Sequence, residues 1–177
     1  MIIIDMYVQV RTPAVKIHHE VSMMKNVFYY DTEIGRIGIA DNGNAVTDIF
    51  FDGETAVDGA SLETPLIRKA AGQIREYLAG TRRDFDLPLE AAGTEFQKRV
   101  WEALQTIPYG ETRSYGQIAA QVGNSKACRA VGMANNKNPI SIVVPCHRVI
   151  GADGRLVGYG GGLHIKERLL KLEKNTK

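Results

Sequence analysis

Hydrophobic positions divide the chain into a first part that predicts strands and a second part that predicts helices. Short apolar runs typical of strands occupy residues 27–30, 36–40 and 46–51. Asn42 followed by Gly43 predicts a tight turn between the second and third runs. We therefore expect an antiparallel sheet in this part of the chain. Residues 4–10 also alternate between apolar and polar and are predicted to add an edge strand.

One helix is predicted directly after these strands. Thr64 is a typical N-cap, and Pro65 is a typical first helical residue. Apolar side chains then recur on one helix face as far as Leu78, and Gly80 stands where a C-terminal glycine is expected. This helix should cover one face of the sheet. Residues 84–92 are predicted to form a linker to the second part.

Two capping boxes open helices in the second part of the chain. Thr94 is followed three residues later by Gln97, and Ser114 is followed in the same way by Gln117. A further helix is predicted to begin at residue 124 or 125, after a glycine turn. Two short helices joined in this way predict a helix-turn-helix, although many such pairs bind no nucleic acid.

The most specific chemistry lies in residues 140–151, which read ISIVVPCHRVIG. The β-branched residues before Pro145 predict a short buried strand that must end at the proline. Cys146 and His147 follow at once. A cysteine after such a strand is commonly an inert buried thiol, but a cysteine beside cationic groups can be a nucleophile. Neighbouring side chains in extended chain point apart, so a water or a backbone bend should connect the two.

Charge is distributed unevenly along the 177 residues. Residues 1–93 hold 9 Lys and Arg against 14 Asp and Glu, whereas residues 94–177 hold 13 against 6. The second part is therefore basic, which fits contact with a polyanion such as nucleic acid. A solvated basic surface with no partner would give the same count.

Composition predicts a soluble cytoplasmic protein without a metal. No apolar run approaches the roughly 18 residues of a membrane helix, and residues 1–4 are too short for a secretory signal. Only Cys128 and Cys146 are present, and a reactive Cys146 requires a reducing compartment. His18 and His19 have no cysteine nearby, so no zinc ligand set is expected.

The motif PCHRV, followed by YGGG and then KERLL, resembles the signature of the O6-alkylguanine-DNA alkyltransferases. The resemblance runs from residue 94 to 173 and extends more loosely over residues 24–90. It implies an α/β fold. Residues 24–90 would form a ribonuclease-H-like structural domain, in which a helix covers an antiparallel sheet. Residues 91–177 would form a mainly helical DNA-binding and methyltransferase domain, and residues 1–23 an extension.

The resemblance also implies an activity. A DNA repair protein of this family transfers the alkyl group of O6-methylguanine, flipped out of double-stranded DNA, irreversibly to Cys146. The protein would act once, without a cofactor, and as a monomer. Glu167 would hold His147 and so activate Cys146, with Asn138 as a further catalytic or loop-stabilising residue. Backbone groups of Cys146, Val149 and Gly160 would read the guanine, together with Tyr115 and Tyr159. The implied DNA contacts are Tyr115, Ser125, Lys126 and Arg129.

Two other functions are compatible with the residues. A cysteine hydrolase could use Cys146 and His147, but papain-like nucleophiles lie at helix N-termini with their histidine far away in sequence. A module that binds alkylated DNA without repairing it is the second alternative. Such alkyltransferase-like proteins replace the cysteine that this chain retains at position 146.

Overall fold

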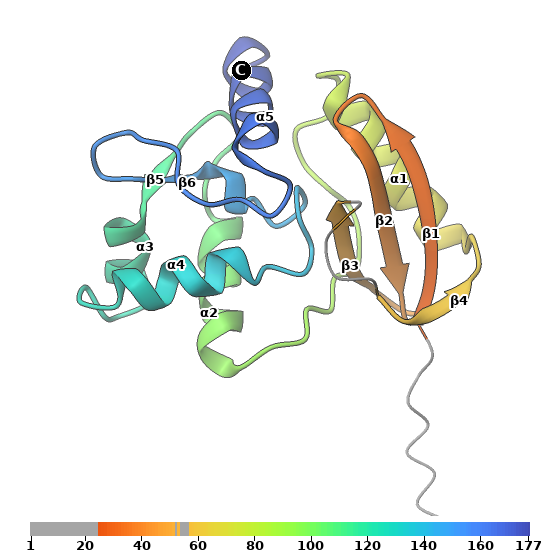
Figure 1. The fold of residues 1–177 in the computed structure, drawn as a ribbon, viewed down its shortest axis with the longest axis horizontal. Coiled ribbons are helices and arrows are strands. Elements are labelled where there is room, and N and C mark those ends of the chain that lie inside the picture. Colours follow the sequence, from red (N-terminus) through yellow and green to blue (C-terminus); the bar gives the residue numbers. More distant parts are fainter. Residues whose placement is uncertain (1–24, 52, 54–56) are drawn as a thin grey trace, which may run out of the picture.

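The computed structural model describes residues 25–51, 53 and 57–177, so the strand expected at 4–10 lies outside the described residues. The N-terminal half contains β1 (Lys25–Thr32), β2 (Gly35–Asp41), β3 (Val46–Phe51), β4 (Gly59–Ser61) and α1 (Pro65–Leu78). The C-terminal half contains α2 (Glu95–Gln105), β5 (Arg113–Ser114), α3 (Tyr115–Gln121), α4 (Cys128–Asn136), the 3-10 helix η1 (Cys146–Arg148), β6 (Val149–Ile150) and α5 (Leu163–Asn175). The two halves lie side by side (Figure 1).

The sheet of the N-terminal half has the strand order β3-β2-β1-β4. The three long strands are antiparallel, as expected, but β4 runs parallel to β1, so the sheet is mixed. Gly43 has a φ of +88° and forms the predicted turn, where its N–H donates to the Asp41 carboxylate. The same buried carboxylate accepts a hydrogen bond from Thr64, which ties this turn to the start of α1.

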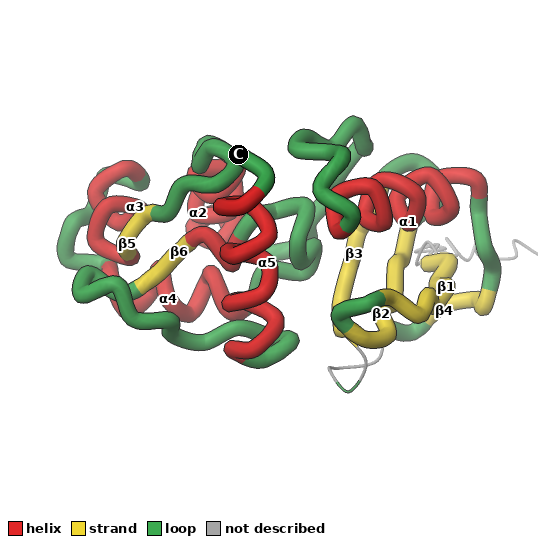
Figure 2. Tube along the Cα trace, turned by 90° about the horizontal axis from the view of Figure 1, so that it is seen from above, coloured by secondary structure: helices red, strands yellow, loops and turns green. Residues whose placement is uncertain are grey.

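Helix α1 forms a layer on one face of the sheet (Figure 2). Its N-cap Thr64 accepts a hydrogen bond from the N–H of Ile67, and Pro65 opens the helix as predicted. Ile67, Ile74 and Tyr77 are completely buried, and the Tyr77 ring meets Phe85, Tyr109 and His147. At the other end Gly80 has a φ of +75°, a conformation that glycine adopts without strain. No helix in the described part of the chain is long and apolar enough to cross a membrane.

The capping boxes predicted for the C-terminal half are both present, at the starts of α2 and α3. Helix α4 starts at Cys128, later than expected. The side chain of Asn124 accepts the N–H of Lys126 in a local turn, which delays the helix. Helices α3 and α4 nevertheless pack against each other and against α2, as a helix-turn-helix requires (Figure 1).

One hydrophobic core runs through both halves and includes buried residues of the sheet, α1, α2 and α5. The outer edge of β3 forms isolated parallel bridges with Leu89 of the linker and with Ile140. The N–H of Ile49 donates to the Pro139 carbonyl at 2.8 Å, and Ser141 N–H donates to the Ile49 carbonyl at 3.0 Å. The N-terminal sheet therefore holds the segment that leads to Cys146.

Candidate active site

Residues 140–144 do not form the expected strand. After one bridge to β3 the chain turns tightly, and Val143 N–H donates to the carbonyl of Ser141 at 2.9 Å. Ile142 has a φ of +71°, a left-handed conformation that is rare for a β-branched residue. All five side chains are buried, as those of an inner strand would be. The sequence therefore predicted the burial of this segment correctly and its backbone wrongly.

Asn138 explains why this segment turns. Its side-chain oxygen accepts the N–H of Ile140 at 3.1 Å, and its Nδ2 donates to the carbonyl of Val144 at 2.8 Å. These bonds satisfy backbone groups that a strand would pair with a neighbour. Nδ2 also lies 3.1 Å from the sulfur of Cys146. Asn138 thus stabilises the turn and provides a hydrogen-bond donor that favours the thiolate over the thiol.

Cys146 begins the short helix η1 and is only 4% exposed. The preceding Pro145 has φ −80° and ψ 61°, and it turns the chain so that the Cys146 N–H donates to the Val144 carbonyl at 2.8 Å. The carbonyl oxygen of Cys146 already accepts hydrogen bonds from the N–H of Val149 and from Nδ2 of Asn135. To accept a hydrogen bond from guanine, this oxygen would have to take a third donor or lose one of these two.

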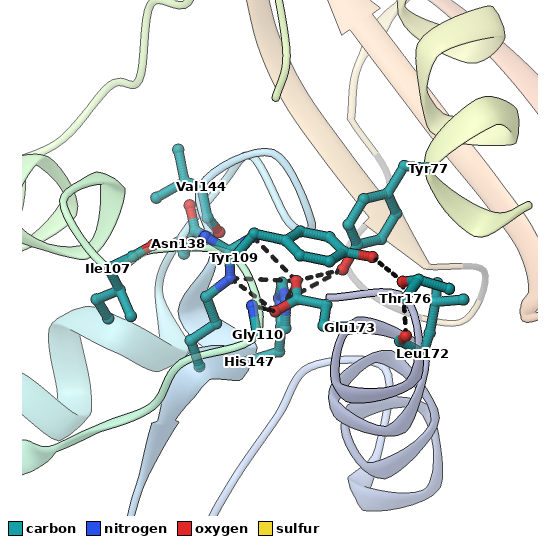
Figure 3. Close-up of polar contacts among 11 residues, drawn as sticks. Tyr77, Ile107, Tyr109, Gly110, Asn138, Val144, His147, Leu172, Glu173 and Thr176 are labelled. Carbon is teal, nitrogen blue, oxygen red and sulfur yellow. Dashed lines mark hydrogen bonds and ion pairs between the residues drawn. The ribbon is translucent and has the colours of Figure 1, made fainter. Parts of the chain in front are cut away.

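His147 is completely buried, and its Nε2 lies 2.9 Å from Oε1 of Glu173 (Figure 3). Burial lowers the pKa of His147 below its usual value, against the opposing effect of Glu173. A neutral histidine has one N–H, and an ionised carboxylate can only accept, so Nε2 carries the proton. Nδ1 is then a proton acceptor, and it has no hydrogen-bond partner among the described residues.

Glu173 is the buried carboxylate around which the polar residues converge. It accepts hydrogen bonds from the hydroxyl of Tyr77 at 2.6 Å, from Nε and Nη2 of Arg148 at 2.9–3.1 Å, and from the N–H of Gly110 at 3.0 Å. Burial alone would raise its pKa, but the hydrogen bonds from His147 and Arg148 and the charge of Arg148 outweigh burial and lower it to about 2. The carboxylate therefore remains charged at neutral pH.

The expected contact between Glu167 and His147 is wrong. Glu167 lies on the outer face of α5, where it pairs with Lys171 at 2.8 Å. The buried stripe of α5 includes Ile165, Leu169 and Glu173, which recur at four-residue spacing. Glu173 therefore takes the place expected for Glu167, and its position on the apolar stripe was the sequence signal for it.

Tyr115 and Lys166 meet at one backbone carbonyl. The hydroxyl of Tyr115 donates to the carbonyl of Val157 at 3.2 Å, and Nζ of Lys166 donates to the same oxygen at 2.8 Å. Burial lowers the pKa of Lys166 to about 8, although the charge of Cys146 opposes this shift. Burial and the charge of Cys146 raise the pKa of Tyr115. Both side chains therefore fix the loop that precedes Tyr159.

Tyr159 is buried between the two halves of the protein. Its ring centroid lies 5.7 Å from that of Phe51 in β3 and 6.5 Å from that of His147. Gly160, which follows Tyr159, is exposed. At Gly161 a Cβ atom would lie 2.6 Å from the Phe51 ring, so the glycine is needed for the close approach of this loop to the sheet.

The residues expected to contact DNA occupy the outer surface of the helix-turn-helix. Ser125 and Lys126 are exposed in the turn, and Arg129 is exposed in the first turn of α4. Tyr115 opens α3 and is half-buried, with its ring beside Gly132 of α4. Val149, which is expected to face the guanine, is buried in β6 and pairs with Arg113.

Four residues of the site were not predicted from the sequence, namely Tyr77, Arg148, Lys166 and Glu173. Tyr77 and Lys166 stand at helix positions whose spacing predicts burial, and a buried hydroxyl or charge needs a polar partner. Arg148 follows His147 in the same motif, and its guanidinium binds Glu173 and the carbonyl of Ile107. Within the described part of the chain, no group of three His, Cys, Asp or Glu could hold a metal ion.

In this fold a buried cysteine comes directly before a histidine that is bound to a buried glutamate, and both follow the packed helix pair α3 and α4. Two family models match the chain. One, described as the ribonuclease-like domain of 6-O-methylguanine DNA methyltransferase, matches residues 27–91, and one described as its DNA binding domain matches residues 95–175. The chain belongs to the 6-O-methylguanine DNA methyltransferase family.

Individual relatives agree with this assignment. A "Methylated-DNA--protein-cysteine methyltransferase" of Mycobacterium leprae is 51% identical over 148 residues, which cover 82% of this chain and 90% of the relative. One of the same name from Methanosarcina acetivorans is 64% identical over 106 residues, covering 60% and 68%. A crystal structure of Mycobacterium tuberculosis OGT in complex with DNA matches with a TM-score of 0.81 at 48% identity, and covers 85% of this chain and 94% of that chain.

Proposed function

We propose that this protein repairs DNA by transferring the alkyl group of O6-alkylguanine to its own Cys146. The observation that carries the proposal is the surroundings of the Cys146 sulfur. Nδ2 of Asn138 lies 3.1 Å from it, and the next residue is a histidine whose Nε2–H is held by Glu173 at 2.9 Å. This arrangement favours a thiolate, which is the nucleophilic form of cysteine.

The proposed reaction is a single displacement at a saturated carbon. The thiol proton passes, through a water, to Nδ1 of His147, whose Nε2–H stays bonded to Glu173. The sulfur then forms a bond to the alkyl carbon as the bond from that carbon to O6 breaks. The electron pair of the broken bond remains on guanine O6, and guanine takes up the proton that His147 had accepted, which restores the neutral histidine. Water does not readily cleave the resulting thioether, so each molecule reacts once.

The proposed DNA contacts would bring a base from inside a duplex to Cys146, a residue that is 4% exposed. The target carbon is inaccessible in the base stack, so the nucleotide must be extruded, which is easiest for a damaged pair. We assign Ser125, Lys126 and Arg129 to the DNA backbone and to the space left by the extruded nucleotide. Tyr115 would crowd the phosphate at the entrance to the pocket.

The guanine itself would contact the loop around Tyr159. The Gly160 amide can donate to the guanine oxygen, and the Val149 carbonyl can accept from its amino group. A displacement of this kind needs no cofactor. We further propose that the protein acts as a monomer in the cytoplasm, where reducing conditions keep Cys146 reactive. Residues 24–90 would serve as its structural domain and residues 91–177 as its DNA-binding and transfer domain.

Mass spectrometry of the protein after incubation with duplex DNA that contains one O6-methylguanine tests the proposal. We expect one added methyl group on Cys146 and none on the exposed Cys128. Cys128→Ser should react like the wild type, whereas Cys146→Ser should bind the DNA without reacting. Repeated turnover without modification of the protein would contradict the mechanism. Binding by the wild type without transfer would favour a module that only recognises alkylated DNA.

A further inference from the structure

The exposed face of α4 carries one large apolar side chain among cations. Met133 is 64% exposed, more than any other large hydrophobic residue in the described part of the chain. Arg129 lies four residues before it in α4, and Lys137, the C-cap residue that follows α4, lies four residues after it; both are exposed. Residues at this spacing stand one above the other on a helix surface. Met133 is therefore placed between two cations on the face opposite the buried Val131 and Ala134.

A second exposed apolar residue lies near this exposed face of α4. Val157 is 49% exposed, and its carbonyl accepts the hydroxyl of Tyr115. A Cβ atom on the following Gly158 would lie 3.0 Å from Oδ1 of Asn136, so this loop contacts α4 one turn beyond Met133. Met133 thus lies on the side of α4 that borders Tyr115 and the loop that precedes Tyr159.

We propose that Met133 is a DNA-contacting residue that packs against deoxyribose or an unstacked base of the strand bound by Arg129 and Lys137. The inference rests on the proposed function. Single exposed apolar residues are common, so exposure alone does not support it. The support comes from position, because a thioether between two exposed cations on the proposed DNA-facing side of α4 would meet the sugars and base edges of the strand that these cations approach. Proteins that distort DNA often place apolar side chains there, and methionine is flexible enough to follow such a surface.

The inference predicts a contact that is insensitive to salt. Cations release counterions when they bind phosphate, so replacing one reduces the dependence of affinity on salt. An apolar contact releases none. Met133→Gln, which keeps side-chain length and helix propensity, should weaken binding about tenfold without changing the salt slope. Met133→Leu restores an apolar surface and should bind nearly as well as the wild type.

Fluorescence anisotropy with the full chain and a labelled duplex carrying one O6-methylguanine, titrated at several salt concentrations, tests this. Lys137→Gln is the comparison and should reduce the salt slope by about one unit. Leu62→Gln, at a 52% exposed position of the N-terminal half, is the control and should bind normally. Reaction with O6-benzylguanine as a base without DNA should be unchanged in Met133→Gln, because no strand is contacted.

Equal duplex affinity of the wild type and Met133→Gln would overturn the inference. The inference would also be overturned if Met133→Gln lost reaction with the isolated base as strongly as it lost duplex affinity, since Met133 would then support the pocket. A reduced salt slope in Met133→Gln would show that the substitution disturbs the neighbouring cations instead. The proposed function is tested separately, by alkyl transfer to Cys146 in the wild type. The effect of Met133→Gln on duplex affinity can be measured even if the protein binds this duplex without reacting.

Discussion

The hydroxyl of Tyr77 lies 2.6 Å from Oε1 of Glu173, the same oxygen that accepts the Nε2–H of His147. Tyr77 belongs to α1 and Glu173 to the last turns of α5, so the bond joins the two halves of the protein (Figure 3). A carboxylate near a helix C-terminus faces the negative end of the helix dipole. The donors around Glu173 offset this unfavourable position, and one of them comes from the N-terminal half.

Tyr77→Phe removes a buried donor to a charged acceptor without changing the ring. We expect it to lower the free energy of unfolding by about 2 kcal/mol at pH 7, the scale of a hydrogen bond to a charged group. Urea denaturation measures this loss. Tyr30→Phe is a matched control, because Tyr30 also donates to a glutamate, Glu63, at 2.7 Å, but water can replace that bond. An equal loss in both variants would contradict the special role of the Tyr77 bond.

Stability should depend on pH through Glu173. The pKa of Glu173 is about 2 in the folded protein and near 4.5 in the unfolded chain, so ionisation favours folding. This contribution is complete above pH 4.5 and is lost as pH falls towards 2. It amounts to the order of 3 kcal/mol. In urea denaturation, the free energy of unfolding should fall less between pH 5 and pH 3 in Glu173→Gln than in the wild type. The variant should also be less stable at pH 7, because Arg148 loses its charged partner.

Glu173 should also control the alkylation reaction, whereas Glu167 should not. Glu173→Gln keeps the size of the side chain but removes the charge that raises the pKa of His147. Alkylation at pH 7 should slow by less than the roughly 10²- to 10⁴-fold that general acid–base catalysis contributes, because His147 itself is retained, and the pH profile should change. Single-turnover kinetics with O6-methylguanine DNA measure both. Glu167→Gln, which loses only an exposed pair with Lys171, should react like the wild type.

Substitutions should separate the two roles of Asn138, which stabilises the turn and donates a hydrogen bond to the Cys146 sulfur. Asn138→Asp retains an acceptor for the Ile140 N–H but replaces the donor beside the Cys146 sulfur with a negative charge. The pH profile for reaction of Cys146 with iodoacetamide should shift to higher pH. Asn138→Ala loses both groups and should destabilise the turn as well. An unchanged profile in Asn138→Asp would show that the amide is needed only for the fold of the turn.

Arg129 should matter for duplex DNA but not for an isolated base. Arg129→Ala should slow repair of O6-methylguanine in a duplex much more than reaction with O6-benzylguanine, because a base outside DNA leaves no gap in a stack. Rates with the two substrates provide the comparison. Equal losses on both would assign Arg129 to the fold of α4, where it is exposed at the start of the helix.

Features set by neighbours in sequence were predicted well. The caps at Thr64, Thr94 and Ser114 depend on residues three positions away, and each is present. The strands β1, β2 and β3 were predicted within two residues of their ends, because their apolar runs end at turn residues. Strand β4 was not predicted, since GAS at residues 59–61 has no apolar pattern and is placed only by pairing with β1.

Features set by distant residues were predicted less well. The segment after Pro139 was predicted to be a strand because its side chains are β-branched. In the structure the side-chain amide of Asn138 forms hydrogen bonds with backbone groups that a strand would pair with a neighbouring strand. Glu167 was expected to hold His147 because the family resemblance implied it. The helix periodicity instead places Glu173 on the buried stripe. The partnership of Glu173 with Tyr77 spans 96 residues, and no local pattern encodes it.

The pairing of β3 with the segment around Ile140 has a consequence for cutting the chain. If the halves were expressed as separate pieces, the outer edge of β3 would lose its bonds to Pro139 and Ser141 and expose unpaired backbone groups. Such an edge is a template for pairing with other chains, so the isolated sheet would tend to aggregate. The isolated helical piece would lose the scaffold of its reactive turn. Reconstitution from fragments should therefore succeed only when both are refolded together.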